Sequence, residues 1–344
     1  MTDINQKLQA LIDKESRKAK THSVLLGVQS KDGRINFQGA AGDASPDSPY
    51  FIASVTKMFT ATVIMQLVDE GRLDLDAPIT DYLPGDLLDG VHIYQGRDYS
   101  RSLKVYQLIH QTSGLPDYFE GRLAEDFKQN HDRAYGVADV VAIASQGSPT
   151  AAPDSGKSHY SDTNYQLLGA IVEAITGQGL AEVFQVHIFD RLGLSDTYLY
   201  DCNQPRPVAP LPLYERDLRL SLPLALTSER GAGGIVSTLA DNLTFLRAYF
   251  EGELFNQAHF ERMYQWNALF FPMQYGYGLM RFKLPRWMTL FRQTPELIGH
   301  SGSSGSFAFY VSGQKLYMAG TFNQFDKPSR PFNFLLKVVT ASAP

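Results

Sequence analysis

The chain has 344 residues, which is long enough to bury a large core in one large domain or in two lobes. Its composition, 44% hydrophobic and 19% charged, is ordinary for a globular protein. Thirty-one basic and 36 acidic residues leave a formal net charge of −5, which provides no polybasic surface for nucleic acid or an anionic membrane. The single cysteine, Cys202, excludes an intrachain disulfide and a cysteine-based metal cluster.

The first 20 residues, MTDINQKLQALIDKESRKAK, predict an amphipathic helix and lack the apolar core of a signal peptide. No run in the chain approaches the roughly 18 apolar residues of a membrane-spanning helix. As written, the sequence predicts a cytoplasmic protein without a membrane span, or a periplasmic or extracellular one if a leader has been removed. Residues 22–42 then predict a β-hairpin that turns at Lys31, Asp32 and Gly33.

The stretch FIASVTKMFT, which begins at Phe51, has two interpretations. In the first, Ser54 is an ordinary N-cap of a helix that ends near Gly71, and Lys57 is a solvated residue of its first turn. That position is unfavourable for a cation, because a helix N-terminus carries partial positive charge. The stretch as far as Val68 is also apolar on nearly every face, which predicts a buried helix. Lys57 is then either excluded from water or at the floor of a cleft.

In the second interpretation, Ser54 is a nucleophile and Lys57 is its base. Residues at i and i+3 lie on one face of a helix, so the two side chains can touch. A serine hydroxyl becomes a good nucleophile when a nearby base accepts its proton, and a desolvated lysine can be that base. The helix N-terminus also offers backbone N–H groups to a developing oxyanion.

The Ser-x-x-Lys pattern is not specific by itself, because it occurs twice in this chain. The second copy, from Ser312 to Lys315, stands between two alternating apolar runs and predicts a hairpin turn. Support for the first copy must therefore come from other parts of the sequence.

The predicted elements beyond the Ser54 helix combine into an α+β fold. Strands near both ends and helices between them indicate one sheet built from both termini, with a helical lobe inserted in the middle. We expect a single domain over residues 1–344, with a sheet lobe at about 1–60 and 225–344 and a helical lobe at about 61–224. In chain order, these elements are a proline-rich loop (73–90), a helix stopped by Gly114 and Pro116, helical patterns (136–147 and 163–194), a glycine turn and helix (229–252), three strands with tight turns (298–325) and a closing helix (330–342).

Tyr160, Ser161 and Asp162 precede a long apolar helix and also have two interpretations. Taken alone, they are a packing tyrosine followed by an N-cap. Alternatively, Tyr160 lies beside Lys57, where a neighbouring cation lowers the pKa of a tyrosine and lets it act as a general acid or base.

The stretch IGHSGSSGSF is the third candidate. It is either a glycine-rich strand start in which His300 is merely polar, or an edge strand that pairs with an extended substrate. In the second case, the Ser303 N–H completes an oxyanion hole. A Gly-x-Ser-x-Gly elbow is not formed, because position 303 holds serine instead of the final glycine.

These three stretches, in this order, resemble the serine β-lactamases and penicillin-binding proteins, especially class C β-lactamases and their DD-carboxypeptidase, D-aminopeptidase and esterase relatives. In that family, Ser-x-x-Lys is followed by Tyr-x-Asn and then by Lys-Thr-Gly or His-x-Gly. Here the stretches are Ser54-x-x-Lys57, Tyr160-Ser161-Asp162 and His300-Ser301-Gly302. LIHQTSGLPDY and GAGGIVSTLADNLTFL resemble further phrases of the family, and the likeness runs from about residue 23 to about residue 340.

The resemblance implies a β-lactamase/transpeptidase-like fold, in which an antiparallel sheet is flanked by helices and the active site lies between the two lobes. It implies that Ser54 is acylated, that Lys57 activates it, and that Tyr160 carries protons to the leaving group. The backbone amides of Ser54 and Ser303 form the oxyanion hole. His300 lines the cleft at the place where the family often holds a substrate carboxylate, and Gly302 belongs to the same substrate-binding strand.

Two residues depart from the family pattern. Asp162 stands where the family most often has Asn, and an ionised Asp accepts hydrogen bonds but cannot donate them. It therefore repels a substrate carbonyl, welcomes an N–H or an amine, and favours the cationic form of Lys57. His300 has no permanent charge at pH 7, so it is a weaker carboxylate clamp than lysine. Both differences favour esters or D-amino peptides over β-lactams.

We therefore expect a serine hydrolase that works through an acyl-enzyme on a small ester, amide or D-amino-acid peptide. Its partner is a small-molecule acyl substrate, and it needs no metal or cofactor. The alternatives are a penicillin-binding or sensor protein that is acylated but turns over poorly, a true β-lactamase, and a catalytically inactive scaffold. The intact set of Ser54, Lys57 and Tyr160 argues against the scaffold.

Overall fold

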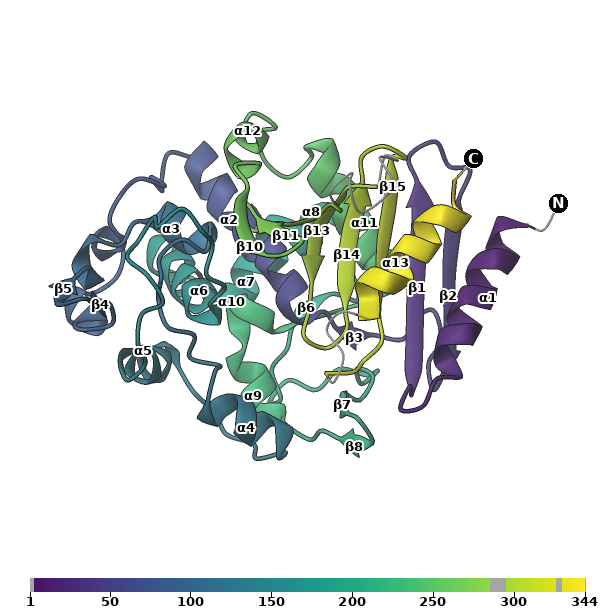
Figure 1. The fold of residues 1–344 in the computed structure, drawn as a ribbon, viewed down its shortest axis with the longest axis horizontal. Helices are drawn as coiled ribbons and strands as arrows, with labels where there is room; N and C mark the ends of the chain where they lie inside the picture. Colours follow the sequence, from purple (N-terminus) through teal and green to yellow (C-terminus); the bar gives the residue numbers. More distant parts are fainter. Residues whose placement is uncertain (1–2, 285–294, 326–329, 344) are drawn as a thin grey trace.

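The computed structural model describes residues 3–284, 295–325 and 330–343 (Figure 1). In this part of the chain, the main sheet has eight antiparallel strands in the order β10-β11-β12-β13-β14-β15-β1-β2. Both ends of the chain contribute adjacent strands, since Leu25 pairs with Thr321. The α+β prediction is confirmed. The strands are β1 (Ser23–Ser30), β2 (Asn36–Gly42), β10 (Asn267–Phe270), β11 (Met273–Tyr275), β12 (Met280–Phe282), β13 (Leu297–Ser301), β14 (Phe307–Val311) and β15 (Leu316–Thr321).

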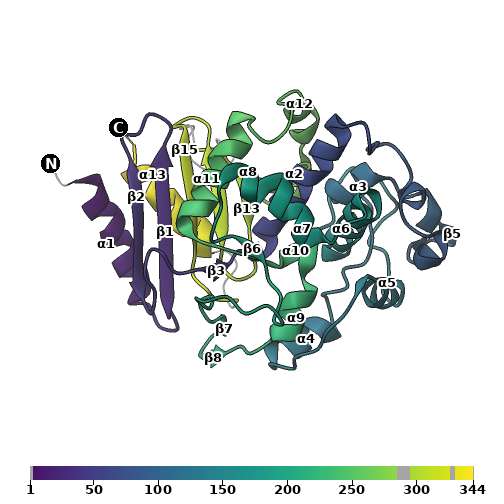
Figure 2. The same ribbon diagram turned by 180° about the vertical axis from the view of Figure 1, so that it is seen from behind.

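Helices cover both faces of the main sheet. The terminal helices α1 (Ile4–Ser16) and α13 (Arg330–Ala341) pack on one face, and α11 (Leu239–Glu251) packs on the other (Figures 1 and 2). Side chains of β1 alternate accordingly: Val24 belongs to the apolar cluster of the first face and Leu25 to that of the second. The strand β1 is therefore buried on both faces.

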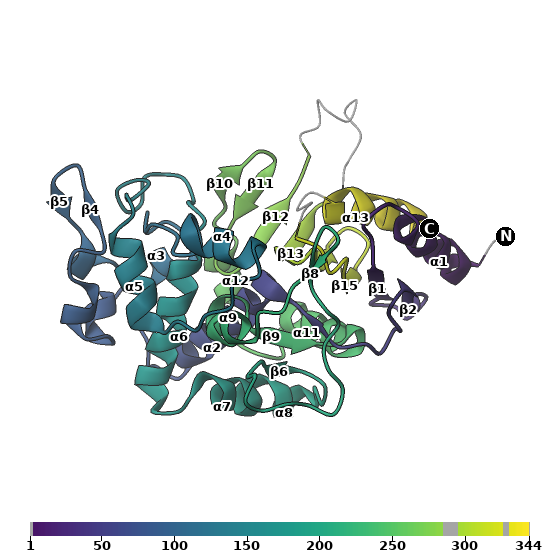
Figure 3. The same ribbon diagram turned by 90° about the horizontal axis from the view of Figure 1, so that it is seen from below.

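A mainly helical region lies beside the sheet, between β2 and β10 in the sequence (Figure 3). It also contains one three-stranded and two two-stranded small sheets among the described residues. The helices are α2 (Thr56–Asp69), α3 (Val105–Ile109), α4 (Arg122–Lys128), α5 (Val137–Ser145), α6 (Asp162–Thr176), α7 (Leu180–Phe184), α8 (Asp190–Leu192), α9 (Pro223–Ser228), α10 (Arg230–Gly233) and α12 (His259–Met263). The short strands are β3 (Tyr50–Phe51), β4 (Ile93–Tyr94), β5 (Arg97–Asp98), β6 (Tyr198–Leu199), β7 (Tyr214–Glu215), β8 (Leu218–Arg219) and β9 (Ile235–Ser237).

Most elements expected from the sequence are present. The α2 helix is buried from Thr56 to Leu67, as its apolar sequence predicts, and Gly71 (φ +68°) follows its end. The second Ser-x-x-Lys copy forms the exposed turn between β14 and β15, where the Lys315 N–H donates to the Ser312 carbonyl. The helical pattern over 163–194 is broken after α6 by Gly177, which has a φ of +70°.

Two expectations differ from the structure. The helix expected to continue to Gly114 ends at Ile109 instead, and Gln111 adopts a left-handed φ of +59°. The Gln111 side chain accepts a hydrogen bond from the Ser161 N–H at 2.9 Å, a contact between distant residues that no local pattern reveals. The strands β10, β11 and β12 were not predicted, because each has only three or four residues.

Among the described residues, no single helix has the length and apolar character needed to cross a membrane. One bent pair, Asp162–Thr176 with Leu180–Leu192, passes the same test by length and composition, with an angle of 83° between its parts.

The turn after β13 packs directly against the segment that carries Ser54. The Ser304 and Ser306 hydroxyls donate to the carbonyls of Phe51 and Ile52, at 3.2 and 2.6 Å. A Cβ atom on Gly302 would lie 2.8 Å from both the Ala53 Cβ and the Ile52 carbonyl oxygen. Glycine is therefore required at position 302 for the sheet to approach the start of α2 this closely.

We expect Gly302→Ala to separate β13 from the Ser54 segment. The added methyl meets the Ile52 carbonyl oxygen, a backbone atom that cannot move cheaply, so the variant should lose about 1–3 kcal/mol of stability, as overpacked sites do. The rate at which a fluorophosphonate labels Ser54 should fall with it. Thermal unfolding and labelling kinetics measure both effects.

Gly313→Ala is the matched control, because a Cβ atom at position 313 has no neighbour within 4 Å. It should behave like the unmodified protein. A Gly302→Ala variant with unchanged melting temperature and labelling rate would contradict the close packing.

Candidate active site

Ser54 lies in a single 3₁₀ turn, Ala53–Val55, that leads from β3 directly into α2. The N-cap position of α2 is Val55, and the cap makes no side-chain hydrogen bond. Ser54 is therefore not an N-cap of this helix. Ala53 has a φ of +46°, an uncommon conformation for a residue other than glycine and one often found at functional sites. The strained turn presents the Ser54 hydroxyl to a pocket.

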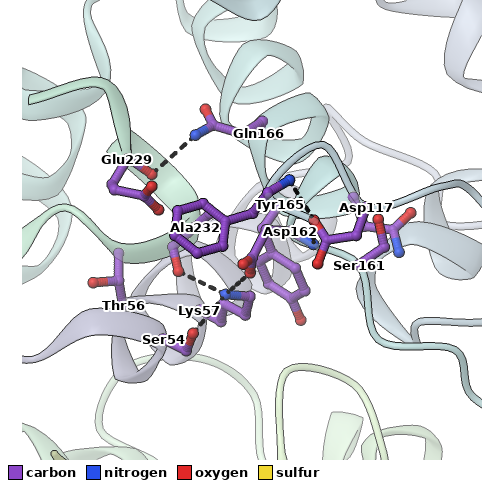
Figure 4. A network of polar contacts seen from close by, with 12 residues as sticks. Ser54, Thr56, Lys57, Asp117, Ser161, Asp162, Tyr165, Gln166, Glu229 and Ala232 are labelled. Carbon is purple, nitrogen blue, oxygen red and sulfur yellow. Dashed lines mark hydrogen bonds and ion pairs between the residues drawn. The ribbon is translucent and has the colours of Figure 1, made fainter. Parts of the chain in front are cut away.

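The Lys57 ammonium is fully buried and has three acceptors around it (Figure 4). It donates to the Ser54 hydroxyl at 3.0 Å and to the Ala232 carbonyl at 2.7 Å, and it lies 2.5 Å from Asp162 Oδ1. Two hydrogen bonds and one ion pair therefore surround the ammonium group. The arrangement suits a buried cation, which is stable only when paired and hydrogen-bonded.

Glycines in α10 bring the Ala232 carbonyl to Lys57. A Cβ atom on Gly231 would lie 3.0 Å from the Tyr165 carbonyl oxygen and 3.3 Å from Thr60 Oγ1. Glycine at position 231 therefore lets α10 pack closely between α2 and α6. The sequence predicts the glycine turn but not this role.

Asp162 is the first residue of α6, next to the Lys57 ammonium. Ser161 occupies the N-cap position, yet its hydroxyl donates to the Pro116 carbonyl at 3.1 Å and makes no cap bond. The Asp162 N–H donates to Asp117 Oδ1 at 3.1 Å. The Asp117 carboxyl thus holds the backbone that presents Asp162 to Lys57.

Tyr160 lies beside both Ser54 and Lys57. Its side chain is hydrogen-bonded to Ser54, and its ring centroid is 5.1 Å from Lys57 Nζ. We expected the lysine to lower the pKa of this tyrosine, and that expectation is wrong. Burial raises the Tyr160 pKa well above its usual range, and the charge of Asp162 adds to the rise. Tyr160 is therefore a neutral phenol that can donate or relay a proton.

His300 does not reach the pocket, which corrects the expectation that it lines the cleft. Its ring is fully buried on the inner side of β13, with Nδ1 2.7 Å from the Ser301 carbonyl oxygen and Nε2 3.2 Å from the Tyr275 hydroxyl. Burial, with Lys57 as a second cause, lowers the His300 pKa to about 3. The imidazole is neutral and cannot clamp a substrate carboxylate here. Side chains alternate along a strand, so its neighbour Ser301 faces the pocket instead.

The pocket has a volume of about 300 Å³ and contains Ser54, Tyr160, Asp162, Gly302 and Ser303 in its lining. No lysine, arginine or histidine is among the described residues that line it. Much of its wall is apolar, including Phe119, Phe127, Leu213, Leu226, Phe270 and Phe325. The described part of the chain contains no group of three or more His, Cys, Asp or Glu side chains arranged to hold a metal ion.

Two acidic residues near Lys57 were missed by sequence reasoning. Asp117 is one, and burial together with the Asp162 charge raises its pKa well above the usual range. Glu229 is the other: burial, then Asp162, raise its pKa to about 7, and the Tyr135 hydroxyl donates to it at 2.5 Å. No spacing in the sequence connects these residues, because they meet only in the folded chain.

Comparison with solved structures supports the same fold over nearly the whole chain. A D-stereospecific amidohydrolase from a Streptomyces species is 27% identical, with a TM-score of 0.81 and 98% of each chain covered. A D-amino acid amidase from Ochrobactrum anthropi SV3, in complex with L-phenylalanine, is 24% identical with a TM-score of 0.82, covering 99% of this chain and 98% of that one. At that identity, the second likeness concerns the fold alone.

Curated relatives match shorter segments. Penicillin-binding protein 4 of Amycolatopsis lactamdurans is 33% identical over 46% of this chain and 38% of its own length. The putative penicillin-binding protein PbpX of Bacillus subtilis is 24% identical over 64% of this chain and 51% of its own length. The matches thus span about half of these relatives or less. The Beta-lactamase family model, by contrast, matches residues 8–341, so the chain belongs to the Beta-lactamase family.

Proposed function

We propose that this protein hydrolyses a small amide or ester of an amino acid with a free amine, through an acyl-enzyme on Ser54. The observation that carries the proposal is the Asp162 carboxylate, which lines the same pocket as Ser54. A carboxylate in that position accepts hydrogen bonds and attracts a cation. No cationic side chain is found among the described lining residues, so a substrate carboxylate forms no ion pair with them.

The proposed reaction uses the contacts around Lys57. The Ser54 Oγ attacks the acyl carbon, its proton passes to Lys57 in the neutral form, and the backbone N–H groups of Ser54 and Ser303 stabilise the oxyanion. Tyr160, as a neutral phenol, carries a proton to the leaving amine or alcohol. Water then cleaves the Ser54 ester and releases the acid.

The apolar wall of the pocket supports an acyl group with a large hydrophobic side chain. A likeness over 98% of the chain to a D-stereospecific amidohydrolase supports the D-configuration and an amide bond. We therefore propose amides of apolar D-amino acids as the preferred substrates.

A penicillin-binding protein that is acylated but turns over slowly is the second candidate, favoured by the likeness to penicillin-binding protein 4 over 46% of the chain. Intact mass over time separates the two candidates. Incubation with D-phenylalaninamide should release phenylalanine with little persistent adduct. A stable penicillin adduct without hydrolysis of the amide would favour the second candidate.

The first prediction is that Ser54 is the only serine acylated. Ser54→Ala should abolish covalent labelling by a fluorophosphonate while thermal unfolding stays close to that of the unmodified protein. Ser312→Ala is the control, because that exposed turn carries the other Ser-x-x-Lys copy. Labelling that persists in Ser54→Ala, or that maps to Ser301 or Ser303, would show that the nucleophile is elsewhere.

The second prediction is that Lys57 and Tyr160 form one proton-transfer unit with Ser54. Residues that act as a unit lose activity non-additively. Lys57→Ala should reduce kcat/KM by ~10³-fold or more and Tyr160→Phe by less, by analogy with other activated nucleophiles. The double variant should be little worse than Lys57→Ala alone. Losses that multiply would mean that Tyr160 acts independently of Lys57.

The third prediction concerns Asp162. Asp162→Asn supplies an N–H donor and removes the charge, so acylation by nitrocefin should rise relative to hydrolysis of D-phenylalaninamide. The change should be about tenfold to a hundredfold, equal to the 1–3 kcal/mol of an unsatisfied buried polar contact. Steady-state rates on both substrates measure it. If both rates change by the same factor, Asp162 acts only through Lys57 and does not select the substrate.

A further inference from the structure

Glu229 connects α9 to α10, and its side chain lines the same pocket as Ser54 and Asp162. A Cβ atom on Gly233 would lie 3.1 Å from Glu229 Oε2 and 3.7 Å from the Ala53 carbonyl carbon. The carboxyl of Glu229 is therefore close to the backbone that carries Ser54. Figure 4 shows Glu229 and Asp162 on different sides of Lys57. Glu229 immediately precedes α10, whereas Asp162 is the first residue of α6.

We propose that Glu229 and Asp162 together form the subsite for the substrate's α-ammonium group, and that Glu229 selects the amine only when its carboxyl is ionised. The inference rests on the proposed function and names the residue that controls its substrate preference.

Charge balance is the reason that a second carboxylate is required. The Asp162 carboxylate already lies 2.5 Å from the Lys57 ammonium, which also donates hydrogen bonds to Ser54 and Ala232. When a substrate binds, its ammonium group and the Lys57 ammonium must therefore share the single negative charge of Asp162. Ionised Glu229 supplies the second negative charge and returns the buried site to neutrality, which a low-dielectric environment strongly favours.

The groups around Glu229 decide when it is charged. Burial is the strongest influence and Asp162 the next, and both raise the Glu229 pKa. Hydrogen bonds from Tyr135 and Tyr118 and the charge of Lys57 oppose them. The resulting pKa is about 7. Ionised Glu229 therefore predominates above pH 7 and becomes rare toward pH 5, so the preference for an amine should weaken as the pH falls.

The test compares two substrates that differ only in the amine: D-phenylalanine p-nitroanilide and 3-phenylpropanoic acid p-nitroanilide. The ratio of their kcat/KM values cancels effects of pH on Ser54, Lys57 and Tyr160, which act on both. Between pH 5 and pH 7 the α-amine stays mostly protonated. In the unmodified protein, the ratio should fall about tenfold or more from pH 7 to pH 5.

Glu229→Gln should lower this ratio at pH 7 by about tenfold to a hundredfold, mainly through KM for the amine substrate, and leave it nearly independent of pH. The rate on the substrate without an amine should change by less than about threefold, because that substrate lacks the group that Glu229 contacts. Glu261→Gln removes the charge of an exposed residue in α12 and serves as the control, with an unchanged ratio.

Tyr135→Phe provides a second test that does not remove the carboxyl. It deletes a donor to Glu229, which raises the Glu229 pKa. The fall in the ratio should therefore move to higher pH, so that at pH 7 the ratio is lower than in the unmodified protein and at pH 5 it is the same. If Glu229→Gln fails to fold, Tyr135→Phe still tests whether Glu229 selects the amine.

The outcomes separate the two proposals. If the unmodified protein shows no preference for the amine, both the proposed function and the Glu229 subsite are overturned. If the preference exists but Glu229→Gln retains it with the same pH dependence, or reduces both substrates equally, only the Glu229 subsite is overturned. If Glu229→Gln loses the preference for the amine but keeps its rate on 3-phenylpropanoic acid p-nitroanilide, the result supports the Glu229 subsite.

Discussion

The buried ammonium of Lys57 is the constraint on which the site depends. A cation without access to water must have acceptors for its N–H bonds and a compensating negative charge nearby. Each acceptor comes from a different part of the chain: Ser54 from the turn before α2, Ala232 from α10, and Asp162 from the start of α6. One charge therefore fixes the relative positions of three segments that are far apart in sequence.

Much of this arrangement is achieved through the backbone. Gly231 lets α10 pack close enough for a carbonyl to reach Lys57, and Gly302 lets the turn after β13 contact the segment before Ser54. The left-handed Ala53 completes the approach by turning the chain sharply before the nucleophile. These residues contribute no functional group, but the functional groups meet because of them.

The difference between the functional side chains and the backbone positions that bring them together explains what the sequence could predict. The α+β class, the buried α2 helix and the turn at Ser312 follow from local patterns of apolar and turn residues, and the ordered motifs led to Ser54, Lys57 and Tyr160. The direction of the Tyr160 pKa and the burial of His300 could not be predicted in that way. Both depend on how deeply the fold buries a side chain and on which charge is nearest to it. Glu229 carries no motif at all, and only the packing of α10 brings it to the pocket.

The balance of charge also limits the kind of substrate that the pocket can accept. Two acidic side chains, Asp162 and Glu229, line it, and no basic side chain is found among its described lining residues. The Lys57 ammonium is already in contact with Ser54, Ala232 and Asp162, and His300 is neutral and buried. An anionic substrate would therefore find no cationic partner among these residues, whereas a cationic one completes the pairing of the two carboxylates. The same geometry that stabilises Lys57 in the empty site thus argues for an amine, and against a carboxylate, as the group that the pocket recognises.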